Sequence, residues 1–504
     1  MTQTEDRLET VTTFDSLNPR TGDVVASHPV HTAEEVAQTV ARAHEEAAWW
    51  GALSYDEREA HLLAWKGVIT RRLPQLADLV HQETGKPHAD ATLEAALAID
   101  HIHWAATHAE KVLKRRRVPS GLSMVNQAAT VEYRPFGVVG VIGPWNYPVF
   151  TPLGSIAYAL AAGNAVVFKP SEHTPGVGEW LAGTFLATIG RPVLQVVTGL
   201  GDTGAALCRS GVGKVAFTGS TATGKRVMAT CAETLTPVVI EAGGKDSVIV
   251  DEDADIEAAA DAALWGAASN AGQTCLGVER IYVHEKVYDE FLASFVDKAR
   301  SVTAYDGPDT KIGPITMPSQ LEIIRSHIQD ALDRGGRAVL GGVDAVGERY
   351  VQPTILVDVP EDSLAVQEET FGPTVTVAKV RTMDEAIEKT NATRYALGST
   401  VFSKSRGMEI ASRVRSGMSA VNGVMTFAGV PSLPFGGVGD SGFGRIHGPD
   451  GLKEFTYSKA ITRQRFKPMM VLTSFTRTPE ADQKVMGTLM MLHGRKGTLP
   501  KRKR

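Results

Sequence analysis

Residues 137–143 read "GVVGVIG", and this β-branched run is the first of a series that decides the fold. The runs that follow it are "NAVVFKP" (164–170), "LQVVTG" (194–199), "KVAFTGS" (214–220) and "TPVVIEAGG" (236–244). Segments of helix length separate these runs, and such alternation is typical of a parallel α/β sheet. Binding loops gather at the carboxyl ends of parallel strands, so we expect a ligand site at that edge.

The regions on either side extend this pattern. Residues 33–116 carry Ala-rich segments with apolar residues at helical spacing, which predicts a helical region before the sheet. A second α/β region is expected from about residue 244 to 443. Its predicted strands are "DSVIV" (246–250), "RIYVH" (280–284), "TVTVAKV" (374–380) and "STVFS" (399–403). The fold class predicted for the chain is therefore α/β.

Length and composition limit the class of protein. A chain of 504 residues exceeds the size of one hydrophobic core, so two or more domains are expected. The net charge of −5 argues against nucleic acid as the main partner. Three scattered cysteines, Cys208, Cys231 and Cys275, do not form a disulfide framework or a metal-binding motif. The polar N-terminus has no apolar signal segment, so we expect a soluble, cytoplasmic protein without a metal.

Cys275 lies in an unusual setting for a cysteine. The surrounding stretch, "SNAGQTCLGVER" (269–280), is rich in small and polar residues. Glycines allow close approach of a ligand, and small neighbours leave a thiol accessible. A core cysteine near a helix start is the plainer interpretation of this stretch alone.

Two segments compete as the phosphate-binding site of a nucleotide. Gly199 begins a G-x-G-x-x-G pattern, but the next strand does not end in the acidic residue that this fingerprint requires. The segment "FTGSTATGK" (217–225) is the better candidate, because Phe217 ends a strand and Gly219, Ser220 and Gly224 lie at a predicted helix start. Free N–H groups at a helix start bind phosphate.

A charged pair follows another predicted strand. In "VVFKPSE" (166–172), Lys169 ends the strand and Glu172 comes three residues later. A carboxylate can accept hydrogen bonds from both hydroxyls of a ribose, and a lysine can bond one of them. Without further support, a strand-end turn with two solvated charges would explain the segment equally well.

Seven motifs in a fixed order connect these features. They are "PWNYP" (144–148), "KPSE" (169–172), "FTGS" (217–220), "EAGGK" (241–245), "GQTC" (272–275), "EETFGP" (368–373) and "PFGGVGDSGFGR" (434–445). With them, the chain resembles the aldehyde dehydrogenase superfamily from about residue 14 to 465. The resemblance implies a Rossmann-like cofactor domain, an α/β catalytic domain and a small β segment for oligomerisation.

The resemblance also implies domain boundaries. The NAD-binding domain would comprise residues 1–113 and 135–243, and the catalytic domain residues 244–443. Residues 114–134 and 456–467 would form the bridging segment of a homodimer or homotetramer. Residues 468–504 form a C-terminal tail beyond the resemblance.

Each catalytic role implied by the resemblance has a chemical reason. Cys275 would attack the aldehyde carbon as a thiolate. The side-chain amide of Asn146 and the backbone N–H of Cys275 would stabilise the oxyanion. Glu241 would act as general base for hydrolysis of the thioester.

The cofactor residues implied by the resemblance surround the same cysteine. They are Pro144, Trp145, Lys169, Glu172, Gly199, Phe217, Gly219, Ser220, Gly224, Glu369 and Phe371. Glu172 would repel the 2′-phosphate of NADP, so NAD is the expected cofactor and NADP a weaker alternative.

Two features of the sequence depart from the family pattern, and two other classes of protein are alternatives to a hydrolytic aldehyde dehydrogenase. Ala242 replaces the leucine that the family usually has after the glutamate, and no second cysteine adjoins Cys275. A relative that transfers the acyl group to coenzyme A would typically lack Glu241. A non-catalytic protein with this fold would usually lose Cys275 or Glu241, and both residues are present.

The substrate pocket implied by the resemblance is apolar. It includes Tyr147, Phe150, Thr151 and the loop 422–437. This loop contains Phe427, Val430, Leu433 and Phe435 and has no Arg or Lys. A carboxylated aldehyde would need a cation there, so a neutral aliphatic or aromatic aldehyde is the expected substrate. Succinate semialdehyde is the alternative.

The tail combines apolar and basic residues. Val485, Leu489 and Leu492 fall on one helical face, and the chain ends in "KRKR". Such a tail could contact an anionic membrane surface peripherally. Packing across a neighbouring subunit is the other interpretation.

Overall fold

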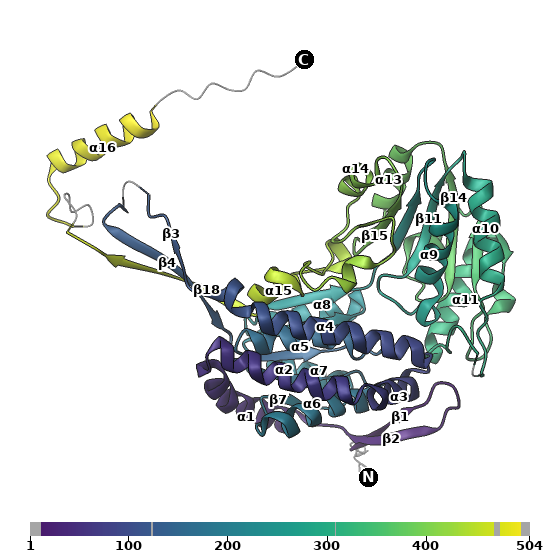
Figure 1. Cartoon of the computed structure of the whole chain (residues 1–504), viewed down its shortest axis with the longest axis horizontal. Helices are drawn as coiled ribbons and strands as arrows, with labels where there is room; N and C mark the ends of the chain where they lie inside the picture. Colours follow the sequence, from purple (N-terminus) through teal and green to yellow (C-terminus); the bar gives the residue numbers. More distant parts are fainter. Residues whose placement is uncertain (1–11, 122–123, 308, 468–473, 495–504) are drawn as a thin grey trace, which may run out of the picture. The chain divides into compact units, whose positions relative to one another are not determined.

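The computed structural model describes residues 12–121, 124–307, 309–467 and 474–494. Contacts divide the chain into two compact units. The main unit comprises residues 1–114 and 133–457, and the small unit comprises residues 115–132 and 458–504. Figure 1 shows the elements of both units along the chain.

The main unit begins with a β-hairpin and four helices. Their bounds are Thr13–Leu17 (β1), Val24–Pro29 (β2), Ala33–Ala52 (α1), Tyr55–Arg71 (α2), Leu73–Thr84 (α3) and His88–Leu113 (α4). Capping boxes start two of the helices, because Thr32 pairs with Glu35 before α1 and Ser54 with Glu57 before α2. The helical region predicted for residues 33–116 is confirmed.

A six-stranded sheet follows, in the order β17-β9-β8-β5-β6-β7. Its strands are Val138–Ile142 (β5), Ala165–Lys169 (β6), Leu194–Val196 (β7), Lys214–Gly219 (β8), Val238–Ala242 (β9) and Gly442–Phe443 (β17), and its helices are Phe150–Ala161 (α5), Pro175–Ile189 (α6), Gly201–Arg209 (α7) and Thr221–Ala232 (α8). All neighbouring strands are parallel except β17, which pairs with β9 in the antiparallel direction. Each β-branched run of the sequence forms one strand of this sheet.

A seven-stranded sheet completes the main unit, in the order β12-β13-β14-β11-β10-β15-β16. Its strands are Asp246–Val250 (β10), Val278–His284 (β11), Arg337–Leu340 (β12), Thr354–Val357 (β13), Thr374–Val380 (β14), Ser399–Phe402 (β15) and Ala420–Val421 (β16). The helices of this region are Ile256–Ala268 (α9), Tyr288–Arg300 (α10), Pro318–Asp333 (α11), Leu364–Gln367 (α12), Met383–Asn391 (α13) and Gly407–Arg413 (α14). Helix α15, Gly448–Glu454, instead packs against α4 and α5. The α/β fold class is confirmed.

The chain passes from the six-stranded sheet to the seven-stranded sheet directly after β9. Strand β9 ends at Ala242 and β10 begins at Asp246, so residues 243–245 connect the sheets. Buried apolar side chains form three clusters in the main unit, with Phe185 in the first, Phe291 in the second and Tyr282 in the third. Phe427 and Phe435 come after the crossing in sequence, yet they belong to the same cluster as Phe185.

The small unit contains most of a three-stranded sheet and one helix. The strands are Arg116–Val118 (β3), Gln127–Pro135 (β4) and Thr456–Gln464 (β18), in the order β18-β4-β3. Helix α16, Pro479–His493, begins at Thr478, whose side chain accepts a hydrogen bond from Ala481 N–H. The helical spacing of Val485, Leu489 and Leu492 is confirmed, and tail residues 468–473 and 495–504 lie outside the described part of the chain.

Candidate active site

Cys275 follows a strained turn after helix α9. Asn270, Ala271 and Gly272 have φ values of 52°, 58° and 72°, so three consecutive residues adopt left-handed backbone conformations. Such conformations persist only where the surrounding structure enforces them. A Cβ atom on Gly272 would lie 2.2 Å from the backbone of Gly372, so only glycine fits there. The turn holds the Cys275 thiol half-buried and free of any disulfide.

Asn146 faces Cys275. Its side-chain Nδ2 lies 3.8 Å from the sulfur of Cys275 and donates a hydrogen bond of 3.0 Å to the carbonyl of Gln273. Asn270 Nδ2 donates to the carbonyls of both Asn146 and Gln273, at 3.1 and 3.0 Å. The side-chain amide of Asn146 is thus fixed, with its N–H groups directed at the Cys275 thiol and at the carbonyl of Gln273.

A buried ion pair supports the Asn146 loop. Lys86 Nζ lies 2.6 Å from Glu94 Oε2, and neither side chain is exposed. The same amine donates to the carbonyl of Asn146 at 2.7 Å. Glu94 Oε1 accepts hydrogen bonds from the N–H groups of Val149 and Phe150, at 2.7 and 3.1 Å. The pair therefore connects helix α4 to both ends of the loop that carries Asn146.

Glu241 lies in strand β9, between Thr218 of β8 and Gly442 of β17. Its side chain is buried, and burial raises its pKa to about 7. Hydrogen bonds with the Thr218 hydroxyl and the Cys275 thiol lower the pKa of Glu241 and so partly offset the effect of burial. A carboxyl with a pKa near 7 can both accept and release a proton near neutral pH.

The thiol itself is protonated at rest. Burial raises the pKa of Cys275 well above its usual range, and the charges of Glu241 and Glu369 act in the same direction. A thiolate at this position therefore requires a base in contact with the thiol, and Glu241 is the carboxylate that shares a hydrogen bond with it.

One cleft of about 890 Å³ contains Cys275 and most of the predicted cofactor residues. The predicted residues that line it are Cys275, Asn146, Pro144, Trp145, Lys169, Glu172, Phe217, Gly219, Ser220, Glu369 and Phe371. The structure thus brings together the carboxyl ends of several strands of the six-stranded sheet and the loop of the nucleophile. Glu241, Gly199 and Gly224 are not among the lining residues.

The two glycines outside the cleft have packing roles. Gly224 lies inside helix α8, where a Cβ atom would lie 3.1 Å from Ile240 of β9, so it allows close contact between helix and sheet. Gly199 adopts a φ of 145° just before α7, and a Cβ atom there would clash with Thr203. Gly201 and Gly204, the later glycines of the same pattern, do line the cleft.

Lys169 and Glu172 form a pair inside the cleft, with 3.7 Å between Nζ and Oε2. Burial lowers the pKa of Lys169, and the Glu172 charge partly offsets this effect. Burial would raise the pKa of Glu172, but Lys169 and local hydrogen bonds outweigh it and lower the pKa. Glu172 is therefore ionised at neutral pH, and both residues line the cleft.

Glu369, Trp145 and Phe371 lie on the part of the cleft near Cys275. Gly244 N–H donates to Glu369 Oε1 at 3.1 Å, and burial raises the pKa of Glu369 to about 8. Trp145 and Phe371 meet edge to face with 5.7 Å between ring centroids. These aromatic rings can cover a flat ligand beside the sulfur.

The predicted substrate residues form an aromatic region. Tyr147 OH lies 3.0 Å from the Thr274 hydroxyl, next to the nucleophile, and the Phe427 and Phe435 side chains of the loop are buried. His447 packs on Phe150 and Phe435, with ring centroids 5.6 and 5.1 Å away. Among the described residues, neither ring nitrogen of His447 has a hydrogen-bond partner.

Sequence reasoning missed several residues of this site. Lys86, Glu94 and Asn270 hold the Asn146 loop, and Thr218 contacts Glu241. No local pattern marks them, because their partners are distant in the sequence. The resemblance could have suggested Thr218, which lies inside the "FTGS" motif.

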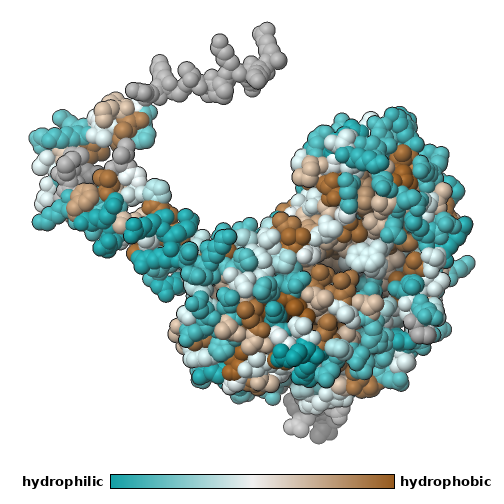
Figure 2. Space-filling view, in the orientation of Figure 1, coloured by the Kyte–Doolittle hydropathy of each residue, from teal (hydrophilic) through white to brown (hydrophobic). Residues whose placement is uncertain are grey.

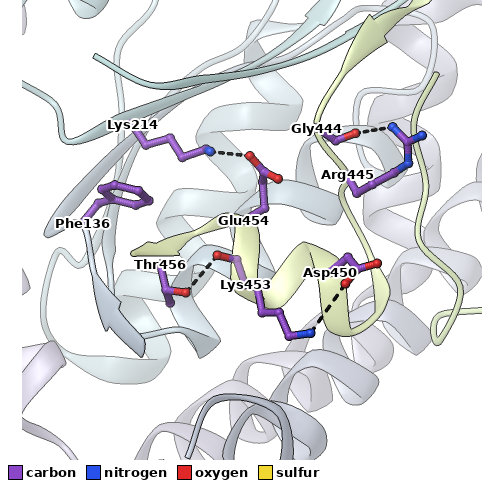
Figure 3. A pocket seen from close by; sticks show the side chains of 8 residues that line it. All are labelled: Phe136, Lys214, Gly444, Arg445, Asp450, Lys453, Glu454 and Thr456. Atoms are coloured by element: carbon purple, nitrogen blue, oxygen red, sulfur yellow. Dashed lines mark hydrogen bonds and ion pairs between the residues drawn. The ribbon is translucent and has the colours of Figure 1, made fainter. Parts of the chain in front are cut away.

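A second hollow, of about 550 Å³, lies at the other end of β8 (Figure 3). Its charged residues pair with each other: Lys214 Nζ lies 2.5 Å from Glu454 and Lys453 Nζ 3.7 Å from Asp450. Arg445 donates to the carbonyls of Gly437 and Gly444. Since these charges already have partners, this hollow is not a candidate ligand site.

Within residues 12–121, 124–307, 309–467 and 474–494, no group of three or more His, Cys, Asp and Glu side chains could hold a metal ion. In the same part of the chain, each helix is too short or too polar to cross a membrane.

Comparisons with known proteins agree with this geometry. The sequence profile of the aldehyde dehydrogenase family matches residues 7–461. A putative succinate-semialdehyde dehydrogenase (NADP(+)) 2 of Mycobacterium ulcerans strain Agy99 is 36% identical over 94% of this chain and 94% of its own. The 4,4′-diapolycopene aldehyde oxidase of a Methylomonas species is 34% identical over 93% of this chain and 87% of its own.

A solved structure gives the same result for the fold. The crystal structure of an NAD-dependent aldehyde dehydrogenase from Sinorhizobium meliloti matches with a TM-score of 0.87 and 33% identity. The match covers 92% of this chain and 93% of that one. The resemblance inferred from seven motifs is therefore confirmed, and this chain belongs to the aldehyde dehydrogenase family.

Proposed function

We propose that this protein oxidises an aldehyde to the carboxylic acid with NAD and water, through a covalent intermediate on Cys275. One observation carries the proposal: Asn146 Nδ2 lies 3.8 Å from the Cys275 sulfur in a cleft that also contains the Lys169–Glu172 pair. A nucleophile, an oxyanion donor and a ribose-binding pair thus share one cavity.

The first step is attack of the sulfur on the aldehyde carbon. Glu241 takes the thiol proton, since its pKa of about 7 leaves much of it ionised at neutral pH. The new C–S bond places negative charge on the former carbonyl oxygen. Asn146 Nδ2 donates to that oxygen, together with the backbone N–H of Cys275.

The residues of the cleft fit a dinucleotide. Lys169 and Glu172 would hold the adenosine ribose, and Ser220 at the N-terminus of α8 would lie beside the pyrophosphate. Trp145, Glu369 and Phe371 would hold the nicotinamide end near Cys275. When bound, NAD accepts the hydride that leaves the substrate carbon, and a thioester remains on the sulfur. NADP is the weaker alternative, because its 2′-phosphate would face Glu172.

Hydrolysis completes the reaction. Glu241 first gives the thiol proton to solvent. It then accepts a proton from water while the oxygen bonds to the acyl carbon, and the C–S bond breaks to release the carboxylic acid and the Cys275 thiolate, which takes the proton back from Glu241. A coenzyme-A-acylating enzyme needs no base for water, so the buried Glu241 favours hydrolysis. Cys275 is in contact with both Asn146 and Glu241, and this arrangement argues against a non-catalytic role.

A neutral aliphatic or aromatic aldehyde fits the pocket best. The loop 422–437 contributes no cation, and its Phe427 and Phe435 side chains are buried. Burial lowers the pKa of His101 to about 4 and that of His447 well below its usual range, so both rings are uncharged at neutral pH. The similarity to 4,4′-diapolycopene aldehyde oxidase supports an apolar substrate.

Succinate semialdehyde is the second candidate. It rests on the 36% identity to the Mycobacterium ulcerans relative of that name. Its carboxylate would need a cation near the pocket, and Lys86, whose amine lies over the Tyr147 ring, already pairs with Glu94.

A panel of aldehydes tests the proposal. The intact protein is mixed with NAD and with hexanal, octanal, benzaldehyde or succinate semialdehyde, and reduced cofactor is followed by absorbance. We expect kcat/KM to be highest for the neutral aldehydes. A preference for succinate semialdehyde would overturn the substrate class, and no reduction with any aldehyde would overturn the proposed function.

The remaining architecture is proposed from the family. Residues 1–113 and 135–243 would form the NAD-binding domain, and residues 244–443 the catalytic domain. Residues 114–134 and 456–467 would join subunits into a dimer or tetramer, in the cytoplasm. Size-exclusion chromatography with light scattering distinguishes the two oligomers.

A further inference from the structure

Two of the three cysteines lie next to each other in the main unit. Cys208 belongs to α7 and Cys231 to α8, and both thiols are free and buried. The two side chains share a hydrogen bond. Neither of these thiols has a role in the proposed reaction, which uses Cys275.

The C-terminal ends of α7 and α8 are held together beside the two thiols. Arg209, the last residue of α7, donates to both carboxylate oxygens of Glu233, at 2.9 and 3.0 Å. Glu233 is the residue that follows α8. The two helices also pack against each other. The contact between Cys208 and Cys231 is therefore one of several contacts between the same two helix ends.

The cofactor cleft is the route by which a small molecule reaches this pair. Figure 2 shows a surface on which hydrophilic side chains predominate, and the two cysteines contribute almost nothing to the surface, because each is only 1% exposed. Cys208 nevertheless lines the cleft, together with Gly201 and Gly204 of the same helix. Their spacing of three and four residues places them on one face of α7. Val227 and Thr230 of α8 line the cleft as well, so it extends between the two helices.

We propose that Cys208 and Cys231 form a redox-sensitive pair, which hydrogen peroxide converts into a disulfide between α7 and α8. Two thiols in hydrogen-bond contact already lie side by side, as a disulfide requires of its sulfur atoms. The hydrogen bond also lowers the pKa of Cys231, although burial acts in the opposite direction. This effect favours the reaction, because the thiolate is the nucleophile in it.

The oxidation proceeds in two steps. The thiolate of one cysteine attacks an oxygen of the peroxide, the O–O bond breaks, and a sulfenic acid forms with release of hydroxide. The sulfur of the other cysteine then attacks the sulfenic sulfur, and the S–O bond breaks as the disulfide forms. Each sulfur loses one electron, and the peroxide gains two. The two thiol protons end in the two water molecules that are released.

Bound cofactor should slow this oxidation, and this expectation rests on the proposed function. If Lys169 and Glu172 hold the adenosine ribose, the adenine attached to it would lie between α7 and α8 and cover Cys208. Only the cofactor-free form of the protein would then react. The rate should fall about tenfold at an NAD concentration about ten times its Kd.

Peptide mapping under non-reducing conditions is the direct test. The full chain is treated with hydrogen peroxide, its remaining thiols are alkylated in denaturant, and it is digested without reductant. We expect the peptides of Cys208 and Cys231 to appear as one linked species, lighter than their sum by two hydrogen atoms. Dithiothreitol should separate them again.

Variants identify the partners in this disulfide. Cys275→Ala should form the same linked species, because the third cysteine takes no part in it. Cys208→Ala and Cys231→Ala each leave one thiol of the pair and should give no linked species. Circular dichroism establishes that each variant is folded, and the map of the unmodified chain decides the question even where one is not.

Three results would overturn the proposal: peroxide leaves both thiols free, it links one of them to Cys275 instead, or the linked species joins two chains. Disulfide formation without NAD tests the pair alone, so a failure of the proposed function would not imitate a failure of the pair. Equal rates of oxidation with and without bound NAD would overturn the placement of the cofactor over Cys208 and leave the redox-sensitive pair standing.

Discussion

The side-chain amide nitrogen of Asn146 lies 3.8 Å from the sulfur of Cys275, and its second contact is the carbonyl of Gln273 at 3.0 Å. The amide is thereby held where negative charge would develop on the substrate oxygen. Because Glu94 and Lys86 fix the loop that carries Asn146, this donor is positioned before substrate binds.

Loss of this donor should slow the chemistry. Asn146→Ala should lower kcat by about 10²–10³, the usual effect of removing one oxyanion donor. Asn146→Asp, which keeps the shape but has no N–H, should be at least as slow. Steady-state kinetics with NAD and a neutral aldehyde measure both. An unchanged kcat in the aspartate variant would mean that Asn146 does not contact the oxyanion.

Activity should depend on pH through Glu241. Burial raises its pKa to about 7, and the group is a base only after it loses its proton. The rate of acyl-enzyme hydrolysis should therefore rise as pH increases through about 7 and level off above it. In Glu241→Gln the rate should be low, and this ionisation should disappear from the profile. If the hydrolysis rate of that variant still rose with pH over the same range, the ionisation would belong to another group, such as Glu369, whose pKa is raised to about 8.

The Lys86–Glu94 pair should matter for both stability and catalysis. Lys86→Met leaves the Glu94 carboxylate buried without its partner, which typically costs about 3–5 kcal/mol in the free energy of unfolding. Urea unfolding measures this loss. Adding Glu94→Gln should restore part of the stability, because the amide oxygen can still accept from Val149 N–H.

The control is the partly exposed pair of Lys298 and Glu257. Lys298→Met should change stability little, since exposed pairs contribute little. If Lys86→Met behaved like this control, the buried pair would not hold the Asn146 loop.

Cofactor choice should follow Glu172. Its carboxylate lies 3.7 Å from Lys169 in the cleft and is ionised at neutral pH. We expect NAD to be preferred over NADP, and Glu172→Gln to move the ratio of kcat/KM values towards NADP. Lys169 should limit the preference for NAD over NADP, because its amine attracts the 2′-phosphate of NADP. Equal use of both cofactors by the unmodified enzyme would contradict the placement of Glu172 at the ribose.

Most of the strands could be predicted because their β-branched runs are buried on both faces of a parallel sheet. "NAVVFKP" contains β6, all of whose residues are buried, and "DSVIV" is the equally buried β10. Motif residues at strand ends, such as Lys169 and Ser220, could also be placed, since strand ends meet at one edge of the sheet.

Other features depend on tertiary contacts that no local pattern reveals. Lys86 reaches Asn146 across 60 positions in sequence, and the left-handed turn at residues 270–272 is imposed by its neighbours. Gly199 and Gly224 match phosphate-loop patterns, yet they serve close packing next to the cleft.

Mass spectrometry of the acyl-enzyme tests the central claim, that Cys275 carries the substrate. The intact protein is mixed with NAD and octanal, quenched in acid during the first turnover and digested, and the peptide masses are compared with those of a sample without aldehyde. We predict that the peptide containing Cys275 gains the mass of one octanoyl group, and that Cys275→Ala gains none. An unmodified Cys275 peptide after reduction of NAD, or an acyl group on Cys208 or Cys231, would contradict the account.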